Sequence, residues 1–219
     1  MIAGGEFQKP LKEGADLMTG STYKRFGGPS SRMVFTSSTK LAARLDIIAF
    51  PGLTANFELS RAAAIVIPVL DLLTQGREYT KMCIFNTKAL AETLHTRECE
   101  VFHVSGKGFT NSLHVALPAA TYGGGDTASK LLEKPNLFTS KIGLPLPPVP
   151  GDFNAIRLGT QEITRWGMHP KNMEPIADFF CRLLLKQEKP EQLKSEVIEF
   201  QKAFQKIHYI RDCLNSDCY

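Results

Sequence analysis

The feature that most constrains the fold is an alternation of short apolar strands with amphipathic helices over residues 97–210. Three strands are predicted, at Val101–Val104, His114–Leu117 and Ile156–Leu158. Helices are predicted over Thr127–Glu133 with Asp126 as its cap, through Leu185 with Asn172 as its cap, and over Glu191–His208. Strands that alternate with helices in this way predict an α/β or α+β lobe.

The residues before this lobe predict two strands followed by long helices. The predicted elements are strands at Ala15–Thr19 and Arg32–Thr36, a short helix at Ser38–Leu45, and a helix at 78–95. Residues 58–75 are apolar on almost every side, a pattern typical of a helix that is buried on most of its surface. Gly76 follows directly and is placed to end this helix.

Composition and charge argue against several classes of protein. The 219 residues are 43% hydrophobic and 22% charged, as in folded globular proteins. A net charge of +4 is too small to indicate a nucleic-acid partner. The longest apolar run, Ala62–Leu70, is too short to span a bilayer and contains Pro68, and no secretory signal is recognised at the N-terminus. We therefore expect neither a nucleic-acid nor a membrane partner.

The five cysteines lack the spacing of a zinc site, and no metal ligand set is predicted. Their odd count and wide separation favour reduced thiols and a cytoplasmic location. Cys181 lies in an apolar helical pattern and is expected in the core. Cys213 and Cys218 belong to a polar tail, residues 212–219, which is expected to be loose; a redox role for this pair is the alternative.

Lys24 is the first candidate for chemistry. It follows a predicted strand and the small hydroxyl residues Ser21 and Thr22, and it precedes Gly27 and Gly28. Small hydroxyls and free backbone N–H groups suit a phosphate. A lysine held there could form a Schiff base with an aldehyde cofactor if its amine were neutral, which the neighbouring Arg25 cation would favour. The alternative is a solvated loop lysine.

Arg157 is the second candidate. It lies between Ile156 and Leu158 in a predicted strand, so its side chain is expected to be buried and to need an anionic partner. A substrate carboxylate would accept two parallel hydrogen bonds from the guanidinium fork. The alternative is an internal salt bridge to an Asp or Glu.

Four segments in order carry a family resemblance: Ile2–Gly5, Thr19–Pro29, Phe50–Leu53 and Ile156–Gly167. Together they resemble the C-terminal half of serine hydroxymethyltransferase, or of a close fold-type I relative that uses pyridoxal 5′-phosphate (PLP). The resemblance implies an α/β fold in which residues 1–60 end the sheet of the PLP-binding large domain. Residues 61–96 would then be connecting helices and residues 97–211 a complete small α/β domain.

The resemblance implies roles for five residues. Lys24 matches the lysine that forms the internal aldimine with PLP, and Ser21 matches a hydroxyl residue that contacts the cofactor. Gly27 and Gly28 lie in the loop that reaches the PLP phosphate of the partner subunit. Arg157 matches the arginine that holds the carboxylate of serine or glycine. The implied reaction converts serine to glycine and passes a one-carbon unit to tetrahydrofolate, in a homodimer.

Two departures from the family pattern lie in the lysine segment. Tyr23 stands where the family usually has histidine, and a phenol can stack or donate but does not titrate near neutrality. We assign Tyr23 to the catalytic residues with Lys24. Ser30 and Ser31 follow Pro29 where a glycine near the phosphate is expected.

Complete members of the family are about twice as long as this chain. Their first half supplies the phosphate-binding turn, a histidine stacked on the pyridine ring and an aspartate at the ring nitrogen. We therefore expect the chain alone to have little or no activity until this half, or a full-length homologue, joins it. The alternatives are a non-catalytic interaction or regulatory module, a threonine transaldolase, or an α-methylserine hydroxymethyltransferase.

Overall fold

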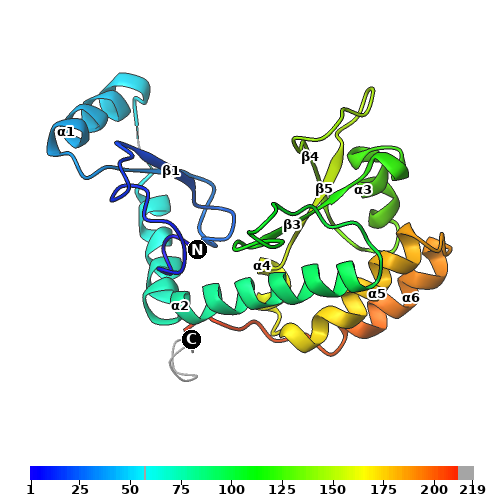
Figure 1. The fold of residues 1–219 in the computed structure, drawn as a ribbon. Helices are drawn as coiled ribbons and strands as arrows, with labels where there is room; N and C mark the ends of the chain where they lie inside the picture. The colour runs from blue at the N-terminus through cyan, green and yellow to red at the C-terminus, as the bar shows by residue number, and fades with distance from the viewer. Residues whose placement is uncertain (57, 212–219) are drawn as a thin grey trace. The chain divides into compact units, whose positions relative to one another are not determined.

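The computed structural model describes residues 1–56 and 58–211 (Figure 1). The described chain divides into two compact units, the first formed by Met1–Thr80 with residues 209–211 and the second by Lys81–His208. One helix, α2 (Leu59–Thr96), contributes residues to both units. The predicted tail with Cys213 and Cys218 lies outside the described residues.

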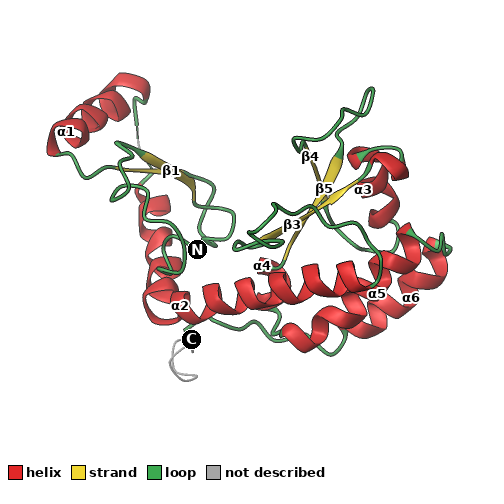
Figure 2. Cartoon of the chain, viewed as in Figure 1, coloured by secondary structure: helices red, strands yellow, loops and turns green. Residues whose placement is uncertain are grey.

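The first unit is built on a two-stranded antiparallel hairpin (Figure 2). Strand β1 (Met18–Ser21) pairs with β2 (Arg32–Phe35), with Met18 opposite Phe35 and Ser21 opposite Arg32. Helix α1 (Thr39–Ile47) follows, and the hydroxyl of Ser38 accepts a hydrogen bond from the N–H of Leu41 at its first turn. A helical turn, η1 (Ile48–Leu53), ends the segment. The two strands and the short helix confirm the predicted elements, with β1 beginning three residues later than expected.

The prediction that Gly76 ends a helix is wrong, because α2 runs without interruption from Leu59 to Thr96. Gly76 is buried where the N-terminal segment approaches α2. A Cβ atom added to Gly4 would lie 2.5 Å from the carbonyl oxygen of Gly76, so the two backbones meet directly. Glu6 also pairs with Arg77 at 2.7 Å. Gly76 thus marks the place where two segments approach each other closely. In the sequence alone, such a glycine looks the same as a glycine that ends a helix.

The apolar side chains of the first half of α2 are exposed within this unit, contrary to the expectation that they are buried. Ile67 and Leu73 expose 56% and 76% of their surface. An 18-residue window of α2 has a mean hydropathy of 1.3, so by length and composition alone this helix of the described chain could cross a membrane. A helix that packs inside a larger soluble protein meets the same criterion. The exposed residues leave an apolar surface on the first unit.

The second unit contains a three-stranded antiparallel sheet in the order β3 (His114–Pro118), β5 (Ala155–Gly159), β4 (Ser140–Ile142). Alternate residues of the sheet, Val115 and Leu117 of β3 and Ile156 and Leu158 of β5, face the core. Figure 1 shows α5 (Met173–Leu184), α6 (Pro190–Gln201) and the end of α2 beside this sheet. Their buried residues Leu94, Met173, Ala177 and Leu193 complete the core. The predicted α/β lobe is therefore confirmed.

Shorter elements connect the strands of this unit. They are η2 (Ala120–Tyr122), α3 (Gly125–Glu133), α4 (Gln161–Arg165) and η3 (Pro170–Asn172). The proline-rich run between β4 and β5 is held by Asn154, whose side chain bonds the N–H and the carbonyl oxygen of Leu144 at 2.8 and 2.9 Å.

Two predicted elements of this unit need correction, and one strand was not predicted. Val101–Val104 is not a strand, because glycines at positive φ, Gly106 at +76° and Gly108 at +71°, turn the chain back and leave only an isolated bridge from Val104. Strand β4 was not predicted, since three residues show no periodicity. Helix α6 ends at Gln201 rather than at His208. The ring of Phe204 still lies 5.2 Å from that of Phe200, so the apolar spacing continues beyond the helix.

Asp152, and not the predicted Asp126, caps helix α3. Its carboxylate accepts hydrogen bonds from the N–H groups of Asp126 at 2.8 Å and Thr127 at 3.1 Å. Asp126 lies in the first turn and pairs with Lys130 and Lys141 instead. The loop before β5 therefore reaches the start of α3, a long-range contact that local sequence does not encode.

Protonating Asp152 is expected to weaken the second unit at low pH. Burial alone would raise the pKa of this carboxyl, but hydrogen bonds from the N–H groups of Asp126, Thr127 and Phe153 lower it to about 2. Because the folded pKa lies below the ordinary value, the stabilisation is full above about pH 4 and is lost as the pH falls toward 2. Thermal melts of the wild type and Asp152→Asn should differ at pH 7 and converge near pH 2. An unchanged difference at both pH values would contradict the capping role.

Candidate functional site

Lys24 lies in the loop that joins β1 to β2, and the fully buried Thr22 closes this loop. The N–H of Thr22 donates to the carbonyl oxygen of Ser31 at 3.0 Å, and the N–H of Ser31 donates back to the Thr22 hydroxyl oxygen at 2.9 Å. The same hydroxyl contacts the carbonyl oxygens of Pro29 and Ser31. One buried side chain thus ties both ends of the loop together.

The closed loop presents Tyr23 and Lys24 outward. Both side chains are exposed, Tyr23 by 48%. The Lys24 amine forms neither a hydrogen bond nor an ion pair with residues 1–56 or 58–211. It is therefore available to an incoming carbonyl group. Ser21 ends β1 half-buried, opposite Arg32, three residues from the lysine.

The two glycines of the loop play different parts. Gly27 has a φ of +77°, and a Cβ atom added to it would meet nothing within 4 Å. Gly28 packs on the helix, since an added Cβ would lie 3.5 Å from the ring of Pro68. Their N–H groups already donate to the carbonyl oxygens of Lys24 and Thr22, at 3.0 and 2.8 Å. In this conformation these N–H groups support the loop, and the phosphate contact of Gly27 and Gly28 stays a prediction.

Replacing Thr22 with valine is expected to loosen the lysine loop. The variant keeps the shape of the side chain but leaves the N–H of Ser31 and two carbonyl oxygens without their hydroxyl partner. Such a loss should destabilise the unit by roughly 1–3 kcal/mol, measured by chemical denaturation. Thr19→Val, on the exposed face of β1, is the matched control. Equal stability of the two variants would show that the Thr22 hydroxyl does not hold the loop.

Arg157 lies on the open face of the sheet in the second unit, so the expectation that it is buried is wrong. Strand pleating explains this, because Ile156 and Leu158 point into the core and Arg157 points away from it. Its Nε donates to the hydroxyl of Ser140, the residue directly opposite on β4, at 3.1 Å. Among the described residues it makes no ion pair, so the internal salt bridge considered from sequence is absent there.

The bond to Ser140 leaves both terminal nitrogens of Arg157 open. Because Nε alone is engaged by residues 1–56 and 58–211, the Nη1 and Nη2 groups can face a planar anion. Ala116 lies opposite Arg157 on the other neighbouring strand and adds no bulk. His114 lies two residues earlier, on the same face of β3. The sheet thus offers a guanidinium whose orientation is set by a cross-strand hydroxyl.

The predicted site residues belong to two different units. Ser21, Tyr23, Lys24, Gly27 and Gly28 lie in the first unit, on one loop. Arg157 lies in the second. That the arginine and the lysine meet in one active site stays a prediction. Sequence reasoning noted the Thr22 hydroxyl but missed its part in closing the loop, which only its position inside the hairpin reveals. It missed Ser140 because strand β4 was not predicted.

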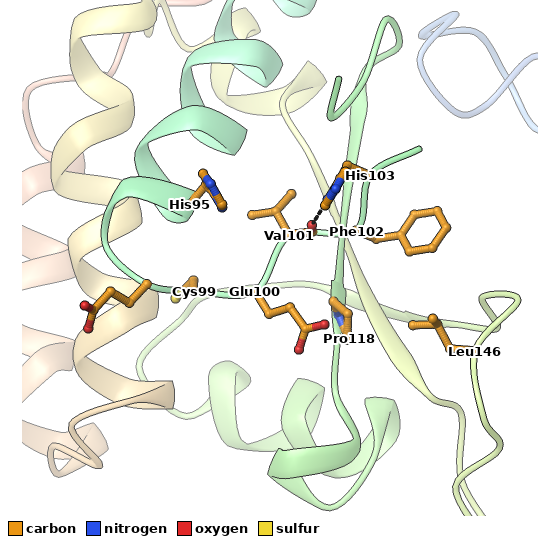
Figure 3. Close-up of a pocket in the computed structure, with 9 residues that line it drawn as sticks. His95, Cys99, Glu100, Val101, Phe102, His103, Pro118 and Leu146 are labelled. Carbon is orange, nitrogen blue, oxygen red and sulfur yellow. Dashed lines mark hydrogen bonds between the residues drawn. The ribbon is translucent and has the colours of Figure 1, made fainter. Parts of the chain in front are cut away.

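The three cavities described in the second unit are lined by other residues. One, of about 540 Å³, lies beside the segment after α2 and is lined by His95, Cys99, His103 and their neighbours (Figure 3). An apolar cavity of about 460 Å³ is lined by Leu158, Trp166 and Phe179, among others. The third, of about 350 Å³, surrounds Asp152. Within the described ranges no group of three or more His, Cys, Asp or Glu side chains is placed to hold a metal ion.

Comparison with known proteins places the chain in a family. The family model for serine hydroxymethyltransferase matches residues 1–180, which include Lys24 and Arg157. The chain is 41% identical over 211 residues to an α-methylserine aldolase of a Ralstonia species, covering 96% of this chain and 48% of that protein. It is 39% identical over 219 residues to a serine hydroxymethyltransferase of Methanocaldococcus jannaschii, covering 97% and 50%.

A solved structure has the same fold. The L-threonine transaldolase of Pseudomonas fluorescens, in its internal aldimine state, matches with a TM-score of 0.85 and 28% identity, covering 97% of this chain and 49% of that one. This match confirms the predicted fold class, the C-terminal part of a fold-type I PLP-dependent enzyme. The chain spans about half the length of these relatives. By the match over residues 1–180, the chain belongs to the serine hydroxymethyltransferase family.

Proposed function

We propose that this chain supplies the cofactor lysine and the substrate arginine of a PLP-dependent hydroxymethyltransferase. The observation that carries the proposal is that one family match contains both Lys24, on its closed and exposed loop, and Arg157, on the open sheet face. Serine is cleaved to glycine, and tetrahydrofolate takes the one-carbon unit. The relatives support a PLP enzyme acting on a small amino acid.

The lysine loop fits PLP in one respect and departs from it in another. The exposed amine of Lys24, without a described partner, suits a Schiff base with the cofactor aldehyde. PLP, when bound, supplies an electron sink for the bond that breaks in the amino acid. The N–H groups of Gly27 and Gly28 are engaged within the loop, so a phosphate contact through them requires the loop to open. Ser21, whose hydroxyl bonds no described residue, is the cofactor contact proposed beside the lysine.

Arg157 binds the amino-acid substrate in this proposal. Its Nη1 and Nη2 groups donate two parallel hydrogen bonds to the substrate carboxylate. Ser140 orients the guanidinium through Nε and thereby acts as a positioning residue. Tyr23 lies directly before the lysine, and its phenol can donate a hydrogen bond but cannot exchange protons near neutral pH as an imidazole would.

A second candidate is an aldolase or transaldolase of the same family. Two observations favour it: the 41% identity to an α-methylserine aldolase, and Tyr23 at the position before the lysine. Such an enzyme would cleave a β-hydroxy amino acid without passing the fragment to tetrahydrofolate. The two candidates share Lys24 and Arg157 and differ in whether tetrahydrofolate takes up the fragment that is cleaved off.

The active form includes more protein than these 219 residues. The relatives are about twice as long, so we propose that the chain works with an N-terminal half, in a homodimer or docked on a full-length homologue. The cytoplasm is its proposed location, in keeping with the buried, reduced thiols Cys83, Cys99 and Cys181.

The decisive experiment supplies the missing half. The chain is assayed alone and joined to the N-terminal half of the M. jannaschii relative, with PLP and serine, in the presence and absence of tetrahydrofolate. Glycine is expected only from the joined protein and only with tetrahydrofolate. Alanine released from α-methylserine without tetrahydrofolate would instead establish the aldolase. Robust turnover by the 219 residues alone would contradict the need for a second half.

A further inference from the structure

Two cysteines far apart in sequence meet in the second unit. The Sγ atoms of Cys99, just after α2, and Cys181, in α5, lie 2.8 Å apart. Both are free thiols, and they expose 2% and 4% of their surface. At this separation one thiol hydrogen-bonds the other, and a disulfide would need only a small approach of the two sulfur atoms.

The surrounding contacts already hold the two segments together. Arg97, two residues before Cys99, pairs with Asp178 at 2.8 Å and with Glu174 at 3.3 Å, and both acidic residues belong to α5. The segment after α2 and helix α5 are therefore joined beside the sulfur atoms whether or not these are bonded. Oxidation of the pair would not require either segment to find the other.

The electrostatics shift the pKa values of the two thiols in opposite directions. The hydrogen bond from Cys99 lowers the pKa of Cys181 and, together with the nearby Arg97 cation, outweighs the opposing effect of burial. The same interaction and burial raise the pKa of Cys99. A pair in which one thiol donates and the other bears the charge is the arrangement that reacts with oxidants.

A cavity reaches one member of the pair, Cys99. Cys99 lines the cavity of about 540 Å³ beside the segment after α2, together with the side chains of His95 and His103. Figure 3 shows the two histidines on either side of Val101, with Cys99 on the same stretch of chain. Hydrogen peroxide is small enough to enter such a space. A second folded protein that carries a thiol is too large to enter it.

We propose that Cys99 and Cys181 form a reversible redox site that hydrogen peroxide oxidises to an intramolecular disulfide. One thiolate sulfur attacks a peroxide oxygen, forming an S–O bond and releasing hydroxide. The sulfur of the other cysteine then attacks this sulfur, forming the S–S bond and releasing a second hydroxide. The two thiol protons and the two hydroxides make two water molecules, so that two sulfurs are oxidised and one peroxide is reduced. Cellular thiols reverse the reaction by exchange.

The test maps the bond in the full 219-residue chain after treatment with hydrogen peroxide. Cys213→Ser and Cys218→Ser are present throughout, so that the cysteines outside the described residues take no part. Trypsin releases residues 98–107 and 172–182 as separate peptides, each with one cysteine. Mass spectrometry is expected to find them linked and two hydrogen atoms lighter than their sum, and dithiothreitol should separate them.

The matched control is Cys83→Ala, which removes a third buried, reduced thiol of the same unit. It is expected to keep the linked peptide, whereas Cys181→Ala should lose it. Circular dichroism of each variant checks the fold before oxidation. In a folded wild-type chain, thiols that stay reduced, oxidise singly to sulfinic acid, or link to Cys83 would each overturn the proposal. This readout needs neither PLP nor turnover and is independent of the proposed function.

Discussion

Lys24→Ala is expected to abolish covalent attachment of PLP to the enzyme assembled with its N-terminal half. The exposed Lys24 amine is the group proposed to form the Schiff base, and alanine has no nucleophile to replace it. The aldimine absorbance should vanish, and glycine production should fall on the order of 10³-fold or more. Borohydride reduction followed by peptide mapping should place the pyridoxyl group on Lys24 in the wild type.

The control for this experiment is Lys12→Ala, which removes another exposed lysine of the first unit. It should keep both the absorbance and the activity. The hairpin itself should be unaffected in Lys24→Ala, since the loop is closed by Thr22 and by backbone hydrogen bonds. Absorbance that persisted in Lys24→Ala, or a pyridoxyl label on another lysine, would show that Lys24 has been misassigned.

Arg157→Ala should raise the KM for serine by roughly 100-fold, because two charge-assisted hydrogen bonds to the substrate carboxylate are lost. The unit should keep its stability, as the side chain lies on the open sheet face and pairs with no acidic residue described here. The measurement is steady-state kinetics of the assembled enzyme. Arg157→Lys should restore little, since an ammonium lacks the planar fork.

The Ser140→Ala variant tests how much the orientation of the Arg157 guanidinium contributes to substrate binding, since its charge is unchanged. The guanidinium remains but loses the hydroxyl that engages its Nε at 3.1 Å, so KM should rise by only roughly 3–10-fold with kcat nearly unchanged. Lys141→Ala, whose residue lies on the other face of β4 and pairs with Asp126, should leave KM as it is. If Arg157→Ala and Lys141→Ala had the same KM for serine, Arg157 would not bind the substrate.

Local patterns predicted the elements that local forces decide. The alternation in β3 and β5 and the spacing of apolar residues in α5 and α6 follow from burial of one face, so the lobe was predictable. Gly76 was misread because a glycine at a helix end and a glycine under a crossing segment look alike in sequence. The capping of α3 by Asp152 depends on a contact across 26 residues, which no local signal carries.

For the candidate site, the structure tests the geometry that was expected and leaves the roles of the residues as predictions. The lysine loop was recognised from its hydroxyl and glycine residues, but the role of Thr22 follows only from its position inside the hairpin. Arg157 was expected to be buried because its two neighbours are apolar, yet pleating turns it to the opposite face from them. An exposed guanidinium can bind a ligand, whereas a buried one would have to pair within the core.

Different residues of the loop have the structural role and the proposed chemical role, and this separation affects how such a chain can evolve. Thr22 and the backbone hold the hairpin, whereas the side chains of Tyr23 and Lys24 contribute no described bond to it. A single substitution at residue 24 would therefore remove the amine proposed to bind PLP and leave the hairpin intact. An active enzyme and an inactive homologue could therefore share this hairpin and differ by one side chain.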